Sequence, residues 1–194
     1  MQSATIQRKT KETNISVSLR IDGSGKYTVS TGIGFLDHMM ELFARHGMFD
    51  IQLKCKGDLH VDDHHTTEDV AIALGQAFSK ALNERAGIAR YGSSYVPMDE
   101  SLARCVVDLG GRSALVFKAE FNRKSVGDLS TEMIRHFFQS FAENIKANIH
   151  VEVLYGSNTH HKIEAMFKSL ARALRASCER DARVKGVLST KGKL

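Results

Sequence analysis

The feature that most limits the fold of this chain is an internal repeat. The segment FLDHMMELFARHGMFDIQL, which contains His38, aligns with MIRHFFQSFAENIKANIHV, which contains His136. Further along, HHTTEDVAIALGQAFSKAL from His64 aligns with HHKIEAMFKSLARAL from His160. Repetition of this length indicates one supersecondary unit used twice. We therefore predict a single domain over residues 1–194, made of two similar halves at about 1–92 and 93–194.

Hydrophobic periodicity predicts the same order of elements in both halves. Alternating segments around glycine-rich turns predict two β-hairpins, Asn14–Arg20 with Lys26–Ser30 and Ala103–Leu109 with Arg112–Glu120. Segments rich in β-branched residues predict strands at Phe49–Lys56 and Ile149–Leu154. Apolar residues at helical spacing predict helices at Phe35–Arg45, Thr66–Arg85, Glu132–Lys146 and Ile163–Arg180. This order predicts an α+β fold with two sheets, each covered on one face by its two helices.

Composition excludes several classes of protein. With 42% hydrophobic and 25% charged residues, the chain is globular and not disordered. It has no apolar run near the ~18 residues of a membrane span, and its first residues lack the apolar core of a signal peptide, so we expect a cytoplasmic protein. The net charge of +5 suits an anionic small molecule, but its scattered basic residues do not predict nucleic-acid binding. Three separated cysteines predict neither a disulfide framework nor a zinc site.

Both histidine pairs belong to the motif HHxxE. Residues four apart share one face of a helix, so the first histidine and the glutamate of each motif can hold one metal ion: His64 with Glu68, and His160 with Glu164. The second histidine of each pair lies about 100° around the helix and serves another ion or another purpose. His38 and His136 are the equivalent upstream histidines of the two halves.

A single pair of adjacent histidines is usually a surface or helix-cap feature. Here the pattern occurs twice, with the upstream histidine at a gap of 26 residues in one half and 24 in the other. Six imidazoles and two carboxylates divide evenly into two sites of three histidines and one glutamate, which predicts two metal ions. These ligands leave manganese, iron, cobalt, nickel and zinc open, and they favour manganese or iron(II) over a closed structural zinc site.

Other polar residues carry weaker signals. Asp62 and Asp63, directly before the first histidine pair, suit two roles: orienting the imidazoles through hydrogen bonds, or stabilising a helix N-terminus. Arginine and lysine bind phosphate well, although an isolated one is more often a solvated surface residue. An anion site can be built from Arg90, Arg112, Lys168 and the terminal Ser189-Thr190-Lys191-Gly192-Lys193-Leu194.

Five segments together resemble the imidazoleglycerol-phosphate dehydratases of histidine biosynthesis. They are TGIGFLDHM (Thr31–Met39), GDLHVDDHHTTEDVAIALGQA (Gly57–Ala77), PMDESLA (Pro97–Ala103), GSNTHHKIEAMFKSLARAL (Gly156–Leu174) and the terminal STKG. The resemblance covers essentially the whole chain, and the two HHxxE motifs in combination are specific. The length suits a stand-alone dehydratase without a fused phosphatase domain.

The resemblance implies a fold of the ribosomal protein S5 domain 2-like type, with two four-stranded sheets packed on a central four-helix bundle. It implies two Mn²⁺ ions per subunit and a homo-oligomer of 24 subunits with active sites at subunit contacts. The implied reaction is that of a hydro-lyase, which eliminates water from D-erythro-1-(imidazol-4-yl)glycerol 3-phosphate to give 3-(imidazol-4-yl)-2-oxopropyl phosphate. Two ions on the two ring nitrogens would accept developing charge while a carboxylate moves protons.

Matching positions carry the family's site residues onto this chain. The resemblance implies one ion bound by His38, His65, His160 and Glu164. It implies a second ion bound by His64, Glu68, His136 and His161. The implied catalytic glutamates are Glu12, Glu68 and Glu164. The implied substrate contacts are Glu12, His38, His46, His64, His65, Arg90, Arg112, His160, His161, Lys168, Ser189 and Lys191, with the phosphate bound by His46, the arginines and the tail.

Two functions from other classes also suit these residues. A dimetal phosphoesterase would need two ions and a phosphate site, although such enzymes usually bridge the ions with aspartates. A non-catalytic metal-binding or storage shell would keep the ligands without needing Arg90, Arg112 or the basic tail. The products formed from imidazoleglycerol phosphate in the presence of manganese distinguish the three.

Overall fold

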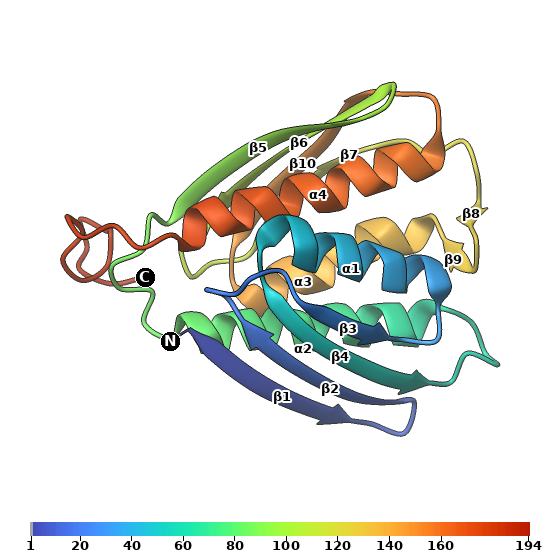
Figure 1. The fold of residues 1–194 in the computed structure, drawn as a ribbon, viewed down its shortest axis with the longest axis horizontal. Coiled ribbons are helices and arrows are strands. Elements are labelled where there is room, and N and C mark those ends of the chain that lie inside the picture. Colours follow the sequence, from blue (N-terminus) through green and yellow to red (C-terminus); the bar gives the residue numbers. More distant parts are fainter. Residues whose placement is uncertain (1) are drawn as a thin grey trace.

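The computed structural model describes residues 2–194, and the same order of elements occurs twice (Figure 1). The first half contains β1 (Ser3–Lys9), β2 (Thr13–Arg20), β3 (Tyr27–Ser30), α1 (Gly34–Gly47), β4 (Asp50–Gly57) and α2 (His64–Leu82). The second half contains β5 (Tyr91–Met98), β6 (Ser101–Asp108), β7 (Ala114–Lys118), α3 (Glu132–Ile145), β10 (Asn148–Tyr155) and α4 (Thr159–Cys178). A small hairpin, β8 (Ser125–Val126) with β9 (Leu129–Ser130), precedes α3.

The two four-stranded sheets have identical topology. Their strand orders are β1-β2-β4-β3 and β5-β6-β10-β7. In each sheet the last strand, β3 or β7, pairs in parallel with β4 or β10, and the other pairings are antiparallel. A parallel pair needs a crossover connection, and α1 and α3 supply it.

Both predicted hairpins are therefore wrong. β2 does not pair with β3, and β6 does not pair with β7, because β2 and β6 already have partners on both sides. The sequence interpretation also missed β1 and β5. Arg8 breaks the apolar alternation of β1 by pointing at Asp69 of α2, and β5 contains Pro97, which is tolerated because β5 is an edge strand.

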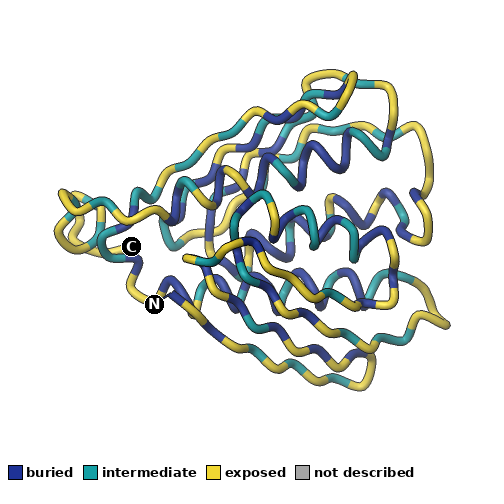
Figure 2. The backbone as a smooth tube through the Cα atoms, viewed as in Figure 1, coloured by how far each residue is buried: buried dark blue, intermediate teal, exposed yellow. Residues whose placement is uncertain are grey.

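The four helices form the central layer between the two sheets (Figure 1). α2 packs against β1 and β2, α4 packs against β5 and β6, and the helices meet as the pairs α2–α3 and α1–α4. Gly75 permits the close approach of α2 to α3, since a Cβ there would lie 2.9 Å from the carbonyl oxygen of Phe141. Buried residues concentrate on the helices and inner sheet faces, while the outer sheet faces are exposed (Figure 2). The predicted α+β arrangement is confirmed.

Helices α2 and α4 begin earlier than the apolar spacing predicts. α2 begins at His64 and not Thr66, and α4 begins at Thr159 and not Ile163, so both histidine pairs lie in the first turn of a helix. Polar first turns carry no apolar stripe, which explains the late predicted start. None of the helices among residues 2–194 is both long and apolar enough to span a bilayer.

Candidate active site

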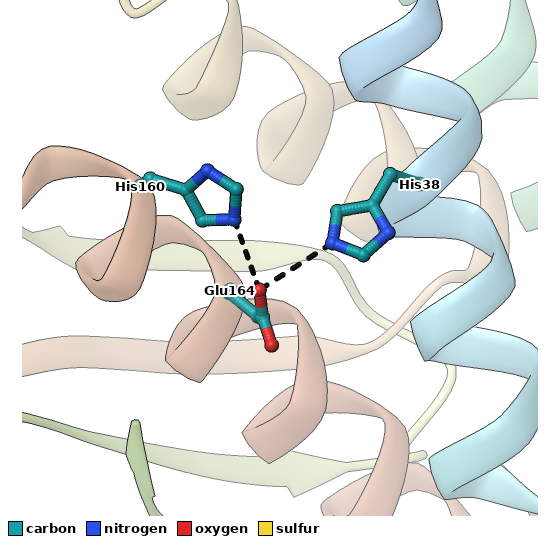
Figure 3. A group of neighbouring side chains, drawn as sticks. All are labelled: His38, His160 and Glu164. Carbon is teal, nitrogen blue, oxygen red and sulfur yellow. Dashed lines mark hydrogen bonds and ion pairs between the residues drawn. The ribbon is translucent and has the colours of Figure 1, made fainter. Parts of the chain in front are cut away.

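Three of the predicted ligands meet where α1 crosses α4. Glu164 Oε2 lies 3.1 Å from His160 Nε2 and 3.4 Å from His38 Nε2, with both imidazoles directed at the carboxylate (Figure 3). His160 and Glu164 share one face of α4, as the spacing of four residues requires. Glu164 is buried, with 7% of its side chain exposed. We refer to His38, His160 and Glu164 as the buried triad.

An equivalent group forms where α2 crosses α3. Glu68 Oε2 lies 3.9 Å from His64 Nε2, and Glu68 Oε1 lies 3.2 Å from His136 Nε2. His136 Nε2 is buried and makes no hydrogen bond, although Glu68 Oε1 lies 3.2 Å away. Glu68 is more open than Glu164, with 36% of its side chain exposed. We refer to His64, Glu68 and His136 as the open triad.

Side-chain hydrogen bonds fix the N-termini of α2 and α4, the two helices that carry the histidine pairs. The Asn158 side chain accepts hydrogen bonds from the backbone N–H groups of His160 and His161. Asp62 accepts from the backbone N–H of His64, and Asp63 accepts from the N–H and hydroxyl of Ser130. Of the two roles open to Asp62 and Asp63, the contacts support the structural one, since neither carboxylate hydrogen-bonds an imidazole among the described residues.

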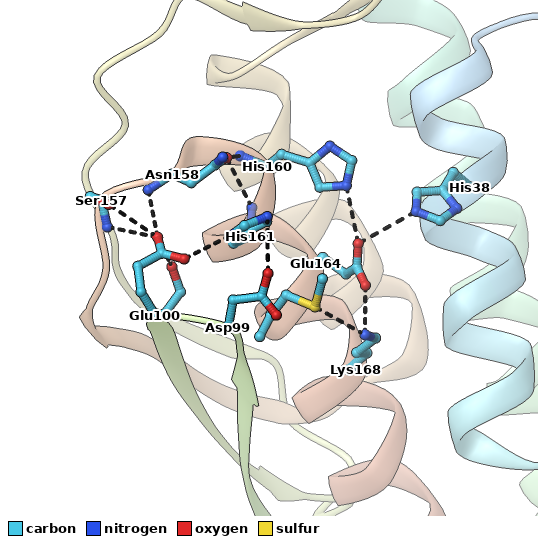
Figure 4. A network of polar contacts seen from close by, with 11 residues as sticks. His38, Asp99, Glu100, Ser157, Asn158, His160, His161, Glu164 and Lys168 are labelled. Carbon is cyan, nitrogen blue, oxygen red and sulfur yellow. Dashed lines mark hydrogen bonds and ion pairs between the residues drawn. The ribbon is translucent and has the colours of Figure 1, made fainter.

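The second histidines of the two pairs lie outside both triads. His65 Nδ1 lies 3.0 Å from Asp58, and His161 Nδ1 lies 2.7 Å from Glu100 (Figure 4). These hydrogen bonds raise the pKa of both histidines. They also place the proton on Nδ1 and leave Nε2 as the nitrogen free to bind a metal.

Sequence reasoning missed Asp58 and Glu100. Asp58 lies six residues before His64, so an acidic residue just upstream of the motif was a usable signal. Glu100 is 61 residues from His161 and reaches it from the turn between β5 and β6, so no local pattern reveals it.

Glu12 and Asp99 stand near the remaining nitrogen of these two histidines. Glu12, in the β1–β2 turn, lies 3.8 Å from His65 Nε2, and its side chain is 52% exposed. Asp99, in the β5–β6 turn, lies 3.8 Å from His161 Nε2. The structure thus places Glu12 beside the predicted metal ligand His65.

Lys168 contacts the buried triad directly. Its Nζ lies 2.5 Å from Glu164 Oε1 and 3.5 Å from the sulfur of Met98 (Figure 4). Burial acts to raise the pKa of Glu164, but the hydrogen bond and charge of Lys168, together with His160 and His38, outweigh it, so the pKa of Glu164 lies below its ordinary value. Burial, followed by the charges of Lys168 and Arg172, lowers the pKa of His46, which keeps that imidazole neutral.

The remaining predicted substrate contacts gather around the C-terminal tail. Arg90, Arg112, Ser189 and Lys191 line one cavity of about 1280 Å³. Arg90 is held there by Asp108, at 2.7 Å, and by a hydrogen bond to the carbonyl of Leu188. The C-terminal tail that lines this cavity lies at the opposite end of the helical layer from the N-termini of α2 and α4 (Figure 1). A helix of 20 residues such as α4 is about 30 Å long.

Each triad offers two imidazole nitrogens and one carboxylate whose ligand atoms lie within 4.8 Å of one another. Imidazole and carboxylate together suit divalent transition metals. The unpartnered Nε2 of His136 is consistent with a ligand to such an ion. The residues therefore fit the expected metals, with three ligands in each triad, while the fourth ligand of each set, His65 or His161, lies outside it.

A family model for imidazoleglycerol-phosphate dehydratase matches residues 31–174. The chain belongs to this family. Relatives carrying the name imidazoleglycerol-phosphate dehydratase include those of Methylorubrum populi, 55% identical over the full length of both chains, and Chloroherpeton thalassium, 58% identical over 97% of this chain and 96% of its own.

Solved dehydratase structures agree with the fold. The enzyme from Staphylococcus aureus superposes with a TM-score of 0.84 at 36% identity, over 92% of this chain and 99% of its own. The enzyme from Pyrococcus furiosus superposes with a TM-score of 0.83 at 32% identity, over 97% of this chain and 100% of its own. All eight candidate metal ligands of this dehydratase lie inside the family match, whereas Glu12, Ser189 and Lys191 lie outside it.

Proposed function

We propose that this protein catalyses the imidazoleglycerol-phosphate dehydratase step of histidine biosynthesis, in the cytoplasm. It eliminates water from D-erythro-1-(imidazol-4-yl)glycerol 3-phosphate to give an enol, which becomes 3-(imidazol-4-yl)-2-oxopropyl phosphate. Membership of the family supports the reaction. The observation that carries the proposal to this site is the pair of equivalent histidine–glutamate triads on facing helices.

We propose that each chain binds two Mn²⁺ ions. One is held by the buried triad with His65, and the other by the open triad with His161. Three observations support these sets: the triads, the unpartnered His136 nitrogen, and the carboxylates that leave Nε2 of His65 and His161 free. When bound, the ions would act as Lewis acids toward the two ring nitrogens of the substrate.

We propose that other copies of the chain complete each site, in an assembly of 24 subunits. His65 and His161 lie outside their own chain's triads. The tail cavity lies about the length of α4 away from the triads, which is too far for one small molecule to bridge. Both facts support an active site shared between subunits.

Within the shared site, the chain's own residues bind the substrate and move its protons. Arg90, Arg112, Ser189 and Lys191 would bind the phosphate through charge-assisted hydrogen bonds, joined by His46 and Lys168. Glu12 would exchange a proton at the substrate side chain, because it is an exposed carboxylate next to a metal-ligating nitrogen. Glu68 and Glu164 would each bind one ion together with the imidazoles of their triad.

We also propose that residues 1–194 form one domain of two halves, about 1–92 and 93–194. The identical strand order of the two sheets supports it, and β5 begins at Tyr91, two residues before the start of the second range. The contacts between α2 and α3 and between α1 and α4 join the two halves through one core.

Product analysis tests the proposal. The purified chain, incubated with Mn²⁺ and imidazoleglycerol phosphate, should give the ketone, and a chelator should stop the reaction while metal analysis counts about two ions per chain. Release of free phosphate would indicate a phosphoesterase instead. Metal uptake without any product would indicate a storage or structural role. His136→Ala serves as the matched variant, since it should abolish turnover without touching the tail cavity.

A further inference from the structure

The two triads differ at the residue one helical turn beyond the glutamate. In the buried triad this residue is Lys168, whose Nζ lies 2.5 Å from Glu164. In the open triad the equivalent residue is Ile72, and among residues 2–194 no lysine or arginine comes within 4 Å of Glu68. The buried triad therefore starts neutral, with its glutamate already paired, whereas the open triad starts with an unpaired negative charge.

The difference extends along the same helix faces. The next turn carries Arg172 in α4 but Gln76 in α2. On the facing helices, His46 of α1 corresponds to Asn144 of α3, and Gln76 donates a hydrogen bond to Asn144 at 3.3 Å. One crossing is thus lined by cations where the other is lined by neutral amides.

The charges next to these positions follow the same trend. Arg45 of α1 corresponds to Glu143 of α3. Burial lowers the pKa of His46 most, and the charges of Lys168, Arg172 and Arg45 lower it further against the opposing charge of Glu164. Arg135 next to His136 shares its cavity with Glu132, so that pair adds no net charge to the open side.

We propose that the two metal sites are unequal and fill in order. The open triad, with Glu68 unpaired, takes the first divalent cation, and the buried triad takes the second only against the charge of Lys168. The inference rests on the proposed two-ion function. Lys168 is then a residue that sets metal affinity, in addition to its expected contact with the substrate.

The physical reason is repulsion between the ammonium and a divalent cation that share one carboxylate. At a few ångströms in a protein environment this repulsion is large, and moving the lysine away instead breaks its ion pair with Glu164. Either route weakens binding at the buried triad, and we expect an affinity ratio of at least about tenfold.

Manganese titration of the full-length, chelator-stripped protein tests the order. The electron paramagnetic resonance signal of free Mn²⁺ counts bound ions, and light scattering on the same samples follows assembly. The wild-type chain should show one tight and one weak site. Lys168→Met should tighten the weak site about tenfold and leave the tight site unchanged. Lys168→Arg, which keeps the charge, should leave both sites as they are.

Matched changes at the equivalent position sharpen the test. Ile72→Met should alter neither site, whereas Ile72→Lys should weaken the tight one. His136→Ala should remove the tight site and His38→Ala the weak one, which assigns each class to its triad. Two ions of equal affinity in the wild type would overturn the proposal that the sites are unequal, and so would a weak site whose affinity Lys168→Met does not change. Either result would leave the proposed two-ion function standing. Fewer than two ions per chain would overturn the proposed two-ion function as well.

Discussion

The two halves hold their second histidine in different ways, although their strands and triads are equivalent. In the first half Asp58, just beyond β4, binds His65, and the β1–β2 turn is anchored separately by the buried Asp69. Asp69 accepts hydrogen bonds from Arg8, at 2.6 Å, and from the hydroxyl of Thr13. The turn is fixed at its base, so Glu12 at its tip keeps a free carboxylate.

In the second half the turn's own glutamate is the anchor. Glu100 binds His161 and also accepts from the backbone N–H groups of Ser157 and Asn158, so it ties the β5–β6 turn to the start of α4 (Figure 4). The position equivalent to Asp69 is Ala165. These hydrogen bonds hold the pKa of Glu100 well below its usual range, so it stays ionised. The two halves keep the same fold, but their turn glutamates differ: Glu12 is free, whereas Glu100 is held by hydrogen bonds. This difference supports Glu12, and not Glu100, as the residue that carries the proton.

The largest expected effect tests how the halves share their ligands. His65→Ala should empty the site of the buried triad and leave the open triad largely occupied, because helical spacing directs His65 away from His64. His161→Ala should do the reverse. Structures of both variants with metal bound decide the matter, with stoichiometry as a secondary measurement. Loss of the open-triad ion in His65→Ala would show that the ligands are not crossed.

The next effect concerns the two orienting carboxylates. Glu100→Gln should weaken metal binding at the site that His161 completes by about 10–100-fold, as is usual when the hydrogen-bond partner of a ligating histidine is lost. Asp58→Asn should weaken the other site by less, because Asp58 holds only His65 whereas Glu100 also ties down Ser157 and Asn158. Manganese titration of both variants measures this. Equal losses would mean that the extra contacts of Glu100 add nothing.

The anchor of the first turn should affect stability and turnover together. Asp69→Asn breaks a partly buried ion pair with Arg8 and should lower the free energy of unfolding by about 1–3 kcal/mol, a value reduced because Arg8 is partly exposed. If the anchor positions Glu12, kcat should fall while KM changes little. Denaturant unfolding and steady-state kinetics provide the measurements. Asp181→Asn, which breaks an exposed pair with Arg183, is the control and should leave the free energy of unfolding nearly unchanged, because solvent screens the pair.

The smallest expected effect concerns the C-terminal tail. The tail follows α4 in the second half, whereas in the first half the chain continues from α2 into β5. Lys191→Ala should raise KM about fivefold and leave kcat nearly unchanged, because a phosphate remote from the reacting carbons is held alike in the ground and transition states. Steady-state kinetics with varied substrate tests this. A large fall in kcat at normal KM would show that the tail orders the catalytic groups.

The sequence by itself determined the duplication, the four helices and the histidine–glutamate pair within each triad. Helical spacing alone places His64 beside Glu68 and His160 beside Glu164, because residues four apart always share a face. Apolar periodicity likewise identified α1 and α3 within two residues of their observed ends. Such features depend on neighbours along the chain, so the sequence carries them completely.

The tertiary structure decided everything that depends on distant partners. β3 pairs with β4 and not with β2, because α1 connects β3 to β4 as a crossover and lets the two strands run parallel. The composition of the strands does not encode this choice of partner. Glu100 reaches His161 across 61 residues, and Arg8 reaches Asp69 across the same number. These contacts form when the packed helices bring remote side chains together, and no local spacing specifies them.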